Sequence, residues 1–230
     1  MQLFDEKTGW EAGRKSVRFT TARLAADPAH AKLVKPFRGL LAEWNATDQE
    51  RRDADDAVVD ANALVAYCND HLDAITGRFV RRLRNDFGDN HPAVGRFFPE
   101  APSEVISLGL ESQIARSKDF FLVAEQVALG PEAKAILDEI AASMKQGSAA
   151  LAAREGAYTA AARVSLKTQT WREKANAARR SLENVLDGWA IAHHEARDYP
   201  DRFFPASAKN KKAKAAKKAK VEGTEAPPSK

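Results

Sequence analysis

The side chains that could bind a metal ion are few, and their spacing does not suit a shared site. The densest group is His193, His194 and Glu195. Adjacent residues on a helix point about 100° apart, so these three side chains are poorly placed to chelate one ion together. A di-iron site in a helical bundle needs a Glu three positions before a His, and none of the five histidines has one. We therefore expect no metal ion and no cofactor.

Nucleophiles and phosphate-binding loops are equally scarce. The single cysteine, Cys68, falls on an apolar helical register, where a small core residue is the expected role. The stretch at residues 13–16, Gly-Arg-Lys-Ser, lacks the first glycine of a phosphate-binding loop, and residues 107–109 lack the glycines of a dinucleotide fingerprint. Carboxylates within residues 48–56 are mixed with arginines, which is typical of a solvated helix face. The sequence predicts no enzyme activity.

Residues 206–230 form a lysine-rich C-terminal tail. Seven of its lysines are clustered: Lys209, Lys211, Lys212, Lys214, Lys217, Lys218 and Lys220. The tail has almost no large apolar residue to offset the entropy of ordering, so disorder is predicted. In composition it resembles the Lys/Ala/Pro tails of linker-histone-like proteins, which implies sequence-independent contact with DNA, RNA or another polyanion. The alternative is a solubilising terminus without a partner.

The basic character of the chain comes from this tail. The whole sequence has a net charge of +4, but the tail alone carries +6, so residues 1–205 hold 28 basic and 30 acidic residues. A mildly acidic body does not suggest a nucleic-acid groove. Any attraction to a polyanion is therefore expected from the tail.

The cellular compartment is predicted from what the sequence lacks. One cysteine cannot form an intramolecular disulfide, which fits a reducing compartment. The N-terminus has no charged-then-apolar signal pattern, and no apolar run is long enough to span a membrane. We expect a cytoplasmic protein without a transmembrane segment.

A four-residue marker, Arg-Phe-Phe-Pro, occurs twice, at residues 96–99 and 202–205. Two aromatic residues after a helix can fold over the open end of a bundle, and the proline prevents a return to helix. One interpretation of Phe97, Phe98, Phe203 and Phe204 is therefore a pair of end plugs. The other is that they are aromatic knobs that dock on a neighbouring subunit.

The marker belongs to a longer internal repeat. A shift of 103 residues places Pro28 on Pro131, Val34 on Leu137 and Leu83 on Leu186, and the shift grows to 106 before the second marker. Repeats of this kind indicate a duplicated structural unit. The sequence therefore predicts unit boundaries at residues 1–99 and 100–205, followed by the tail at 206–230.

Each repeat is predicted to contain a short helix and a long helix of about 55–60 residues. Asp27-Pro28 and Gly130-Pro131 suit the starts of the two long helices. Apolar residues follow a strict 4-3 spacing over residues 33–79 and a weaker one over residues 136–189, which indicates coiled-coil packing. Breaks near residues 45–47 and 147–148 are the alternative to continuous helices.

The predicted fold class is all-α, an elongated, coiled-coil-like helical bundle of two repeated units. The leading functional expectation is a non-enzymatic structural or scaffolding protein that self-associates through its helical seams or aromatic ends. The alternative is a nucleic-acid-associated protein that binds DNA or RNA non-specifically through its tail. A third possibility is an enzyme or cofactor binder with a pocket that the sequence does not reveal.

Overall fold

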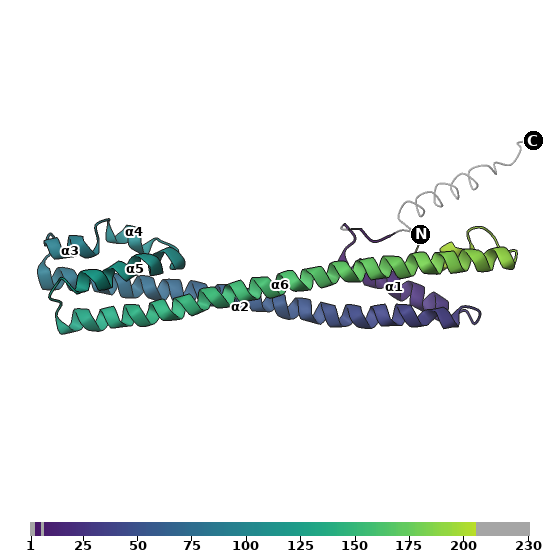
Figure 1. Ribbon diagram of the computed structural model, residues 1–230, viewed down its shortest axis with the longest axis horizontal. Coiled ribbons are helices and arrows are strands. Elements are labelled where there is room, and N and C mark those ends of the chain that lie inside the picture. The colour runs from purple at the N-terminus through teal and green to yellow at the C-terminus, as the bar shows by residue number, and fades with distance from the viewer. Residues whose placement is uncertain (1–2, 6, 206–230) are drawn as a thin grey trace, which may run out of the picture. The chain divides into compact units, whose positions relative to one another are not determined.

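The computed structural model describes residues 3–5 and 7–205, and within them the protein is all-α, with no strand (Figure 1). The α-helices are α1 (Trp10–Ala25), α2 (Val34–Phe87), α3 (Pro92–Phe97), α4 (Pro102–Ile106), α5 (Leu110–Ala124) and α6 (Pro131–Ala192). Two 3-10 turns, η1 (Ala31–Leu33) and η2 (Tyr199–Phe203), complete the set. No helix of this described part is long and apolar enough to cross a membrane.

The two long helices are continuous. α2 has 54 residues and α6 has 62, close to the predicted length, and neither breaks at residues 45–47 or 147–148. α2 ends before Gly88, whose φ of +92° is the left-handed conformation that commonly ends a helix. α6 begins at Pro131, as predicted from Gly130-Pro131.

The predicted start of α2 at Asp27-Pro28 is wrong by six residues. Asp27 does accept a hydrogen bond from the Ala29 N–H, at 3.0 Å, but this closes a turn rather than a helix. His30 then has φ −114° and ψ 2°, outside the helical region, and its side chain is buried. The chain next forms the 3-10 turn η1, and the α-helix begins only at Val34.

Described residues of Met1–Glu50 and Val164–Lys230 form one compact unit, unit 1, and Arg51–Arg163 form another, unit 2. Each unit therefore contains part of α2 packed against part of α6. Unit 1 adds α1 and η2, whereas unit 2 adds α3, α4 and α5. The compact units divide the chain differently from the sequence repeat, because each takes one long-helix segment from either repeat.

The 103-residue shift also aligns buried positions. Residues that are buried in both repeats include the pairs Val34 and Leu137, Phe37 and Ile140, Leu40 and Ser143, Trp44 and Gly147, Leu72 and Ala175, and Phe79 and Leu182. These equivalent positions are thus buried in both repeats, although their side chains differ.

The 4-3 register predicts burial along both long helices. Every seam position of α2 between 33 and 79 is buried or half-buried, and Leu72 is fully buried. In α6, Val185 is the exception, at 47% exposed, because Leu186 faces the core in its place. The register therefore holds for α2 and shifts near the end of α6.

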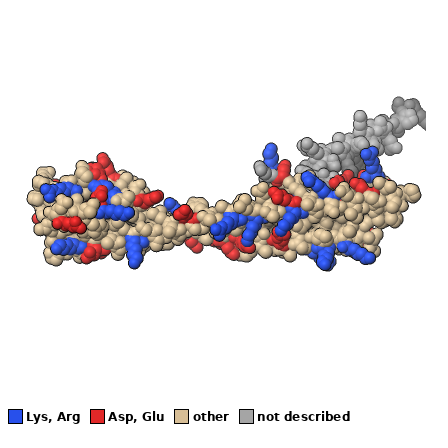
Figure 2. Space-filling view, in the orientation of Figure 1, with Lys and Arg blue, Asp and Glu red and all other residues tan. Residues whose placement is uncertain are grey.

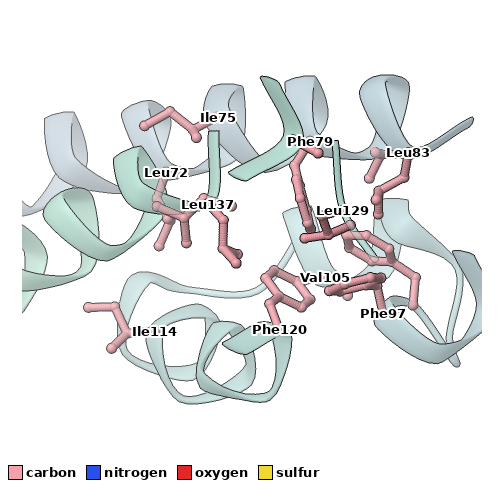
Figure 3. Packing of buried hydrophobic residues seen from close by; sticks show 14 of the residues in the cluster. Leu72, Ile75, Phe79, Leu83, Phe97, Val105, Ile114, Phe120, Leu129 and Leu137 are labelled. Atoms are coloured by element: carbon pink, nitrogen blue, oxygen red, sulfur yellow. The ribbon is translucent and has the colours of Figure 1, made fainter. Parts of the chain in front are cut away.

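The core of unit 2 joins α2, α6 and the three shorter helices (Figure 3). Phe79 of α2 contacts Phe97, Phe98 and Phe120, with ring centroids 5.3, 6.4 and 5.8 Å away. Such aromatic groups contribute more than their buried area alone.

Three tryptophans fill the middle of unit 1. Trp10 of α1 stacks on Trp44 of α2 and meets Trp171 of α6 edge-on, each with ring centroids 5.0 Å apart. The Trp171 indole N–H donates to the Leu40 carbonyl at 2.8 Å, which satisfies a buried polar group. These contacts link α1, α2 and α6.

Ion pairs accompany the apolar contacts between α2 and α6. In unit 1, Lys167 pairs with Glu50 at 2.5 Å and Lys174 with Glu43 at 2.6 Å. In unit 2, Arg78 pairs with Glu139 and Arg82 with Glu132. Exposed pairs contribute little stability, so they mainly favour this register over others.

Candidate functional site

The predicted end plugs lie inside the cores of their own units. Phe97 and Phe98 belong to the core of unit 2, and Phe203 and Phe204 to that of unit 1, all at most 5% exposed. All four rings thus contribute to the packing of their own unit. The seven clustered lysines of the predicted polyanion contact lie outside the described residues.

The residues with metal-binding or nucleophilic side chains have structural roles. Cys68 is a buried core residue. The His193 ring stacks on Trp189, and His194 has a φ of 54°, a left-handed conformation that ends α6. The Glu195 N–H donates to the Ala190 carbonyl at 2.9 Å as part of the same helix end. Among the described residues, no group of three or more His, Cys, Asp or Glu side chains could hold a metal ion.

The strongest candidate site is a buried arginine in unit 1. Arg179 of α6 is only 2% exposed. Its guanidinium carbon lies 4.7 Å from the ring centre of Phe4 and 4.9 Å from that of Phe204, and one terminal nitrogen donates to the Ser16 hydroxyl at 2.7 Å. The Arg179 side chain therefore lies between one residue before α1 and one residue after η2.

Burial changes the acid–base behaviour of this arginine. It lowers the pKa of the Arg179 side chain to about 10, because the charged form loses solvation, while Glu183, one turn further on, favours the charge. The group is still a cation at neutral pH. Its attraction to the two aromatic rings is stronger in this desolvated setting than it would be at the surface.

The same part of α6 binds the backbone before α1. The Asn176 amide accepts a hydrogen bond from the Phe4 N–H and donates one to the Phe4 carbonyl, both at 2.8 Å. The Phe4 ring stacks on Trp171, with centroids 6.1 Å apart and planes 5° apart. One residue in extended chain is thus held by its backbone and its side chain together.

An open pocket of about 320 Å³ continues along α6 from this contact. Its lining is mostly polar: Phe4, Asp5, Ser165, Thr168, Gln169, Arg172, Glu173 and Asn176. Arg172 also donates to the Thr8 carbonyl at 3.4 Å. The pocket offers hydrogen-bonding groups of both kinds to a chain that runs along the helix.

A second buried polar group lies at the other end of unit 1. His30 and the Tyr199 hydroxyl are 2.9 Å apart, and Tyr199 donates to Asp27 at 3.4 Å. Burial raises the pKa of Tyr199, and the nearby Asp27 carboxylate raises it further. The His30 ring is surrounded by Trp189, Tyr199 and Phe203, so this network anchors η2 rather than opening to solvent.

No protein-family model matches the chain, and neither a curated protein nor a solved structure matches it.

In unit 2 an arginine also contacts the residues of the Arg-Phe-Phe-Pro marker, by different interactions. Arg116 of α5 pairs with Glu100 at 2.5 Å and donates to the Phe97 carbonyl at 3.2 Å. The hydrogen bond from Arg116 lowers the pKa of the Glu100 carboxyl. Arg116 is not the repeat equivalent of Arg179, since the 103-residue shift places Thr76 at that position. An arginine thus contacts the Arg-Phe-Phe-Pro residues in each unit, but from positions that are not equivalent in the repeat.

Part of the unit 2 core is polar. Thr76 and Ser117 are fully buried, and their hydroxyl groups have no hydrogen-bond partner within the described part of the chain. Burial raises the pKa of Asp73, as does the charge of Asp70, while the Gln113 amide opposes the shift. Buried polar groups without partners cost stability, so this region stabilises unit 2 less than its apolar surroundings do.

Sequence reasoning missed the Arg179 site. Arg179 lies one position after Ala178, which the 4-3 register assigns to the seam, so the pattern places it at the edge of the core. Phe4 precedes the first predicted helix, in a stretch with no periodicity. The available signals were a lone aromatic residue before α1 and an arginine beside a seam, and neither indicates a contact between distant residues.

Proposed function

We propose that this protein is a non-enzymatic structural or scaffolding protein that self-associates through the helices of unit 2. The supporting observation is an exposed set of large apolar side chains on residues 51–68 of α2 and 147–163 of α6. These two stretches belong to unit 2 and pack together through small residues. The cytoplasmic location expected from the sequence is part of the same proposal.

The seam between these two stretches is thin. Its buried members are the small residues Ala54, Ala61, Cys68 and Ala150, while Gly147 is buried against α5. Small side chains bring helices close but remove little apolar surface from water, and a helix derives most of its stability from tertiary packing. This part of unit 2 would therefore gain more than the rest from an additional partner helix.

The outer surface of the same stretches carries large apolar residues. Four of them are about half exposed or more: Val59 at 65%, Leu64 at 47%, Tyr67 at 64% and Tyr158 at 52%. Single exposed apolar residues are ordinary, but several on one pair of helices favour an interaction surface.

Charge favours a second copy as the partner. Residues 51–68 contain two arginines and four aspartates, a net charge of −2, whereas residues 147–163 contain two arginines and one glutamate, a net charge of +1. In a two-fold dimer, α2 of one copy can lie on α6 of the other, so that opposite charges meet twice. On the face seen in Figure 2, both signs of charge are interspersed.

Analytical ultracentrifugation over a wide concentration range tests this proposal. We expect reversible dimers of the wild-type protein. The double variant Val59→Arg/Tyr67→Arg should weaken dimerisation at least about tenfold, because arginine opposes the basic stretch of α6 and removes apolar contact. Ile191→Arg is the matched control, since Ile191 is 78% exposed near the end of α6 in unit 1. A wild-type protein that stays monomeric at millimolar concentration would refute the proposal.

Polyanion binding is the second candidate function. It rests on the sequence of residues 206–230, in which seven lysines lie between positions 209 and 220. Basic segments bind nucleic acids through phosphate contacts that do not depend on base sequence. Self-association of the body would then present several tails to one polyanion, which raises the apparent affinity.

A further inference from the structure

Within the N-terminal segment, residues 1–8, Phe4 is held against α6 of unit 1 by contacts that resemble those between a receptor and an extended peptide. Asn176 makes two hydrogen bonds with the backbone of Phe4, one to its N–H and one to its carbonyl. A side-chain amide that pairs with both backbone groups of one residue recognises extended chain without reading its side chain. The Asn176 contact therefore selects conformation, not sequence.

Selectivity for the side chain comes from three neighbours. The Phe4 ring stacks on Trp171 and on the guanidinium of Arg179. Phe204 contacts the same guanidinium, at 4.9 Å. We call these four residues, Trp171, Asn176, Arg179 and Phe204, the docking groove. A flat cation and an indole ring together favour an aromatic residue over an aliphatic one.

The described part of the segment also has a local structure of its own. The Thr8 hydroxyl donates to the Asp5 carboxylate at 2.7 Å, and the Asp5 N–H donates to the Thr8 hydroxyl at 3.1 Å. Gly9 connects this turn to α1, and no atom outside its immediate neighbours lies within 4 Å of where its Cβ would be. Glycine has the widest choice of backbone conformations, so the chain can change direction at Gly9 while the turn keeps its internal hydrogen bonds.

We propose that the docking groove also accepts the N-terminal segment of a second copy, so that two chains exchange segments. The exchanged contacts would be the same as those within one chain, so little is lost apart from the entropy of association. This inference rests on the self-association proposed above, but it uses unit 1 and not the exposed side chains of α2 and α6 in unit 2. It assigns the groove a partner, namely an extended segment with an aromatic residue.

A donor and an acceptor variant test the exchange. A chain that lacks residues 1–8 has a free groove but no segment to donate, and a chain with Asn176→Ala keeps the segment but has a weakened groove. Both carry Val59→Arg/Tyr67→Arg, which weakens association through unit 2. Sedimentation of each alone should give monomers, whereas the mixture should give a one-to-one complex. A mixture that stays monomeric at concentrations of several hundred micromolar, with both chains folded by circular dichroism, overturns the inference.

A synthetic peptide of residues 1–9, labelled at its C-terminus, gives an independent measurement. Fluorescence anisotropy should show saturable binding to the chain that lacks residues 1–8. Adding Asn176→Ala to that chain should weaken binding about tenfold, as expected for two lost backbone hydrogen bonds. Asn184→Ala, an exposed position on the same helix, is the matched control and should change nothing. A peptide with Phe4→Ala that binds as well as the natural one would contradict the role of the ring contacts.

The two proposals fail separately in these experiments. If association through unit 2 is wrong, the wild-type protein will be as weakly associated as Val59→Arg/Tyr67→Arg, yet the peptide will still bind. If the exchange is wrong, the donor and acceptor chains will stay monomeric when mixed, yet dimers of the wild-type protein will persist with Asn176→Ala.

Discussion

Gly147 of α6 lies so close to Ile114 of α5 that an added Cβ atom would be 2.9 Å from the Ile114 Cδ1 atom. The Leu110 Cδ1 atom would lie 3.1 Å from the same added Cβ atom. The repeat equivalent of Gly147 is Trp44, which stacks on Trp10 in unit 1. In unit 2 the glycine leaves room for the side chains of α5, whereas in unit 1 the large side chain of Trp44 on α2 occupies the equivalent position.

Alanine substitutions at two glycines of α6 should therefore have opposite effects. Gly156→Ala meets open space, so it should stabilise the protein by about 0.5–1 kcal/mol through helix propensity. Gly147→Ala gains the same propensity but forces Ile114 and Leu110 to move, so we expect net destabilisation. Urea denaturation followed by circular dichroism measures both. Equal stabilisation by the two changes would show that α5 does not pack on Gly147 as described.

Much of the fold was predictable because long helices leave a periodic signal. The 4-3 spacing identified the seam of α2, including Leu72, and it gave the length and continuity of both long helices. The same periodicity could not place the first turn of α2. There His30 is buried by contacts with Trp189 and Tyr199, which are far away in sequence.

The candidate site was not predictable, for a related reason. Its central contacts join Phe4 to Asn176 and Arg179, more than 170 residues apart in sequence, and Phe4 lies outside any helix. A buried arginine has no sequence pattern, because arginine is ordinarily exposed. Such a contact becomes visible only when the packing of the helices brings the segment and the groove together.

The acid–base state of Asp73 should make unit 2 sensitive to pH. Burial raises the pKa of Asp73 in the folded protein, with a contribution from Asp70, so the ionised carboxylate destabilises the fold. This penalty appears as pH rises through the raised pKa and is absent below the unfolded value of about 3.9. Asp73→Asn should therefore raise the melting temperature at pH 7 but not at pH 3.

Asp70→Asn serves as the control for Asp73, since Asp70 is exposed on the same helix. It should give a smaller increase at pH 7, because it removes one cause of the shift and not the buried group. Thermal melts of the three proteins between pH 3 and pH 8 make the comparison. An increase for Asp73→Asn that is independent of pH would mean that packing, and not charge, is responsible.

Arg179 should stabilise unit 1 mainly by filling the space between Phe4 and Phe204. Arg179→Ala leaves this space empty and should cost about 2–4 kcal/mol of unfolding free energy. Arg179→Met retains most of the volume and removes a buried charge, so it should cost less than half as much. Arg180→Ala, at an exposed neighbouring position, should change stability little. If the Met and Ala variants prove equally unstable, the cation itself holds the two rings.

The lysine-rich tail should account for any binding to nucleic acid. The chain without it has a small net negative charge, whereas residues 206–230 carry +6. Each phosphate neutralised contributes a slope of about −0.9 to log K against log salt, so several contacts would make binding collapse between low and physiological salt. Removing residues 206–230 should abolish the DNA shift at low salt and leave the thermal melt of the body nearly unchanged. The matched control replaces the seven clustered lysines by glutamine, which keeps the length of the tail and removes its charge. Binding that survives both changes would contradict the tail's role and direct attention to the body. If neither the full-length nor the truncated chain binds, self-association remains as the function to test.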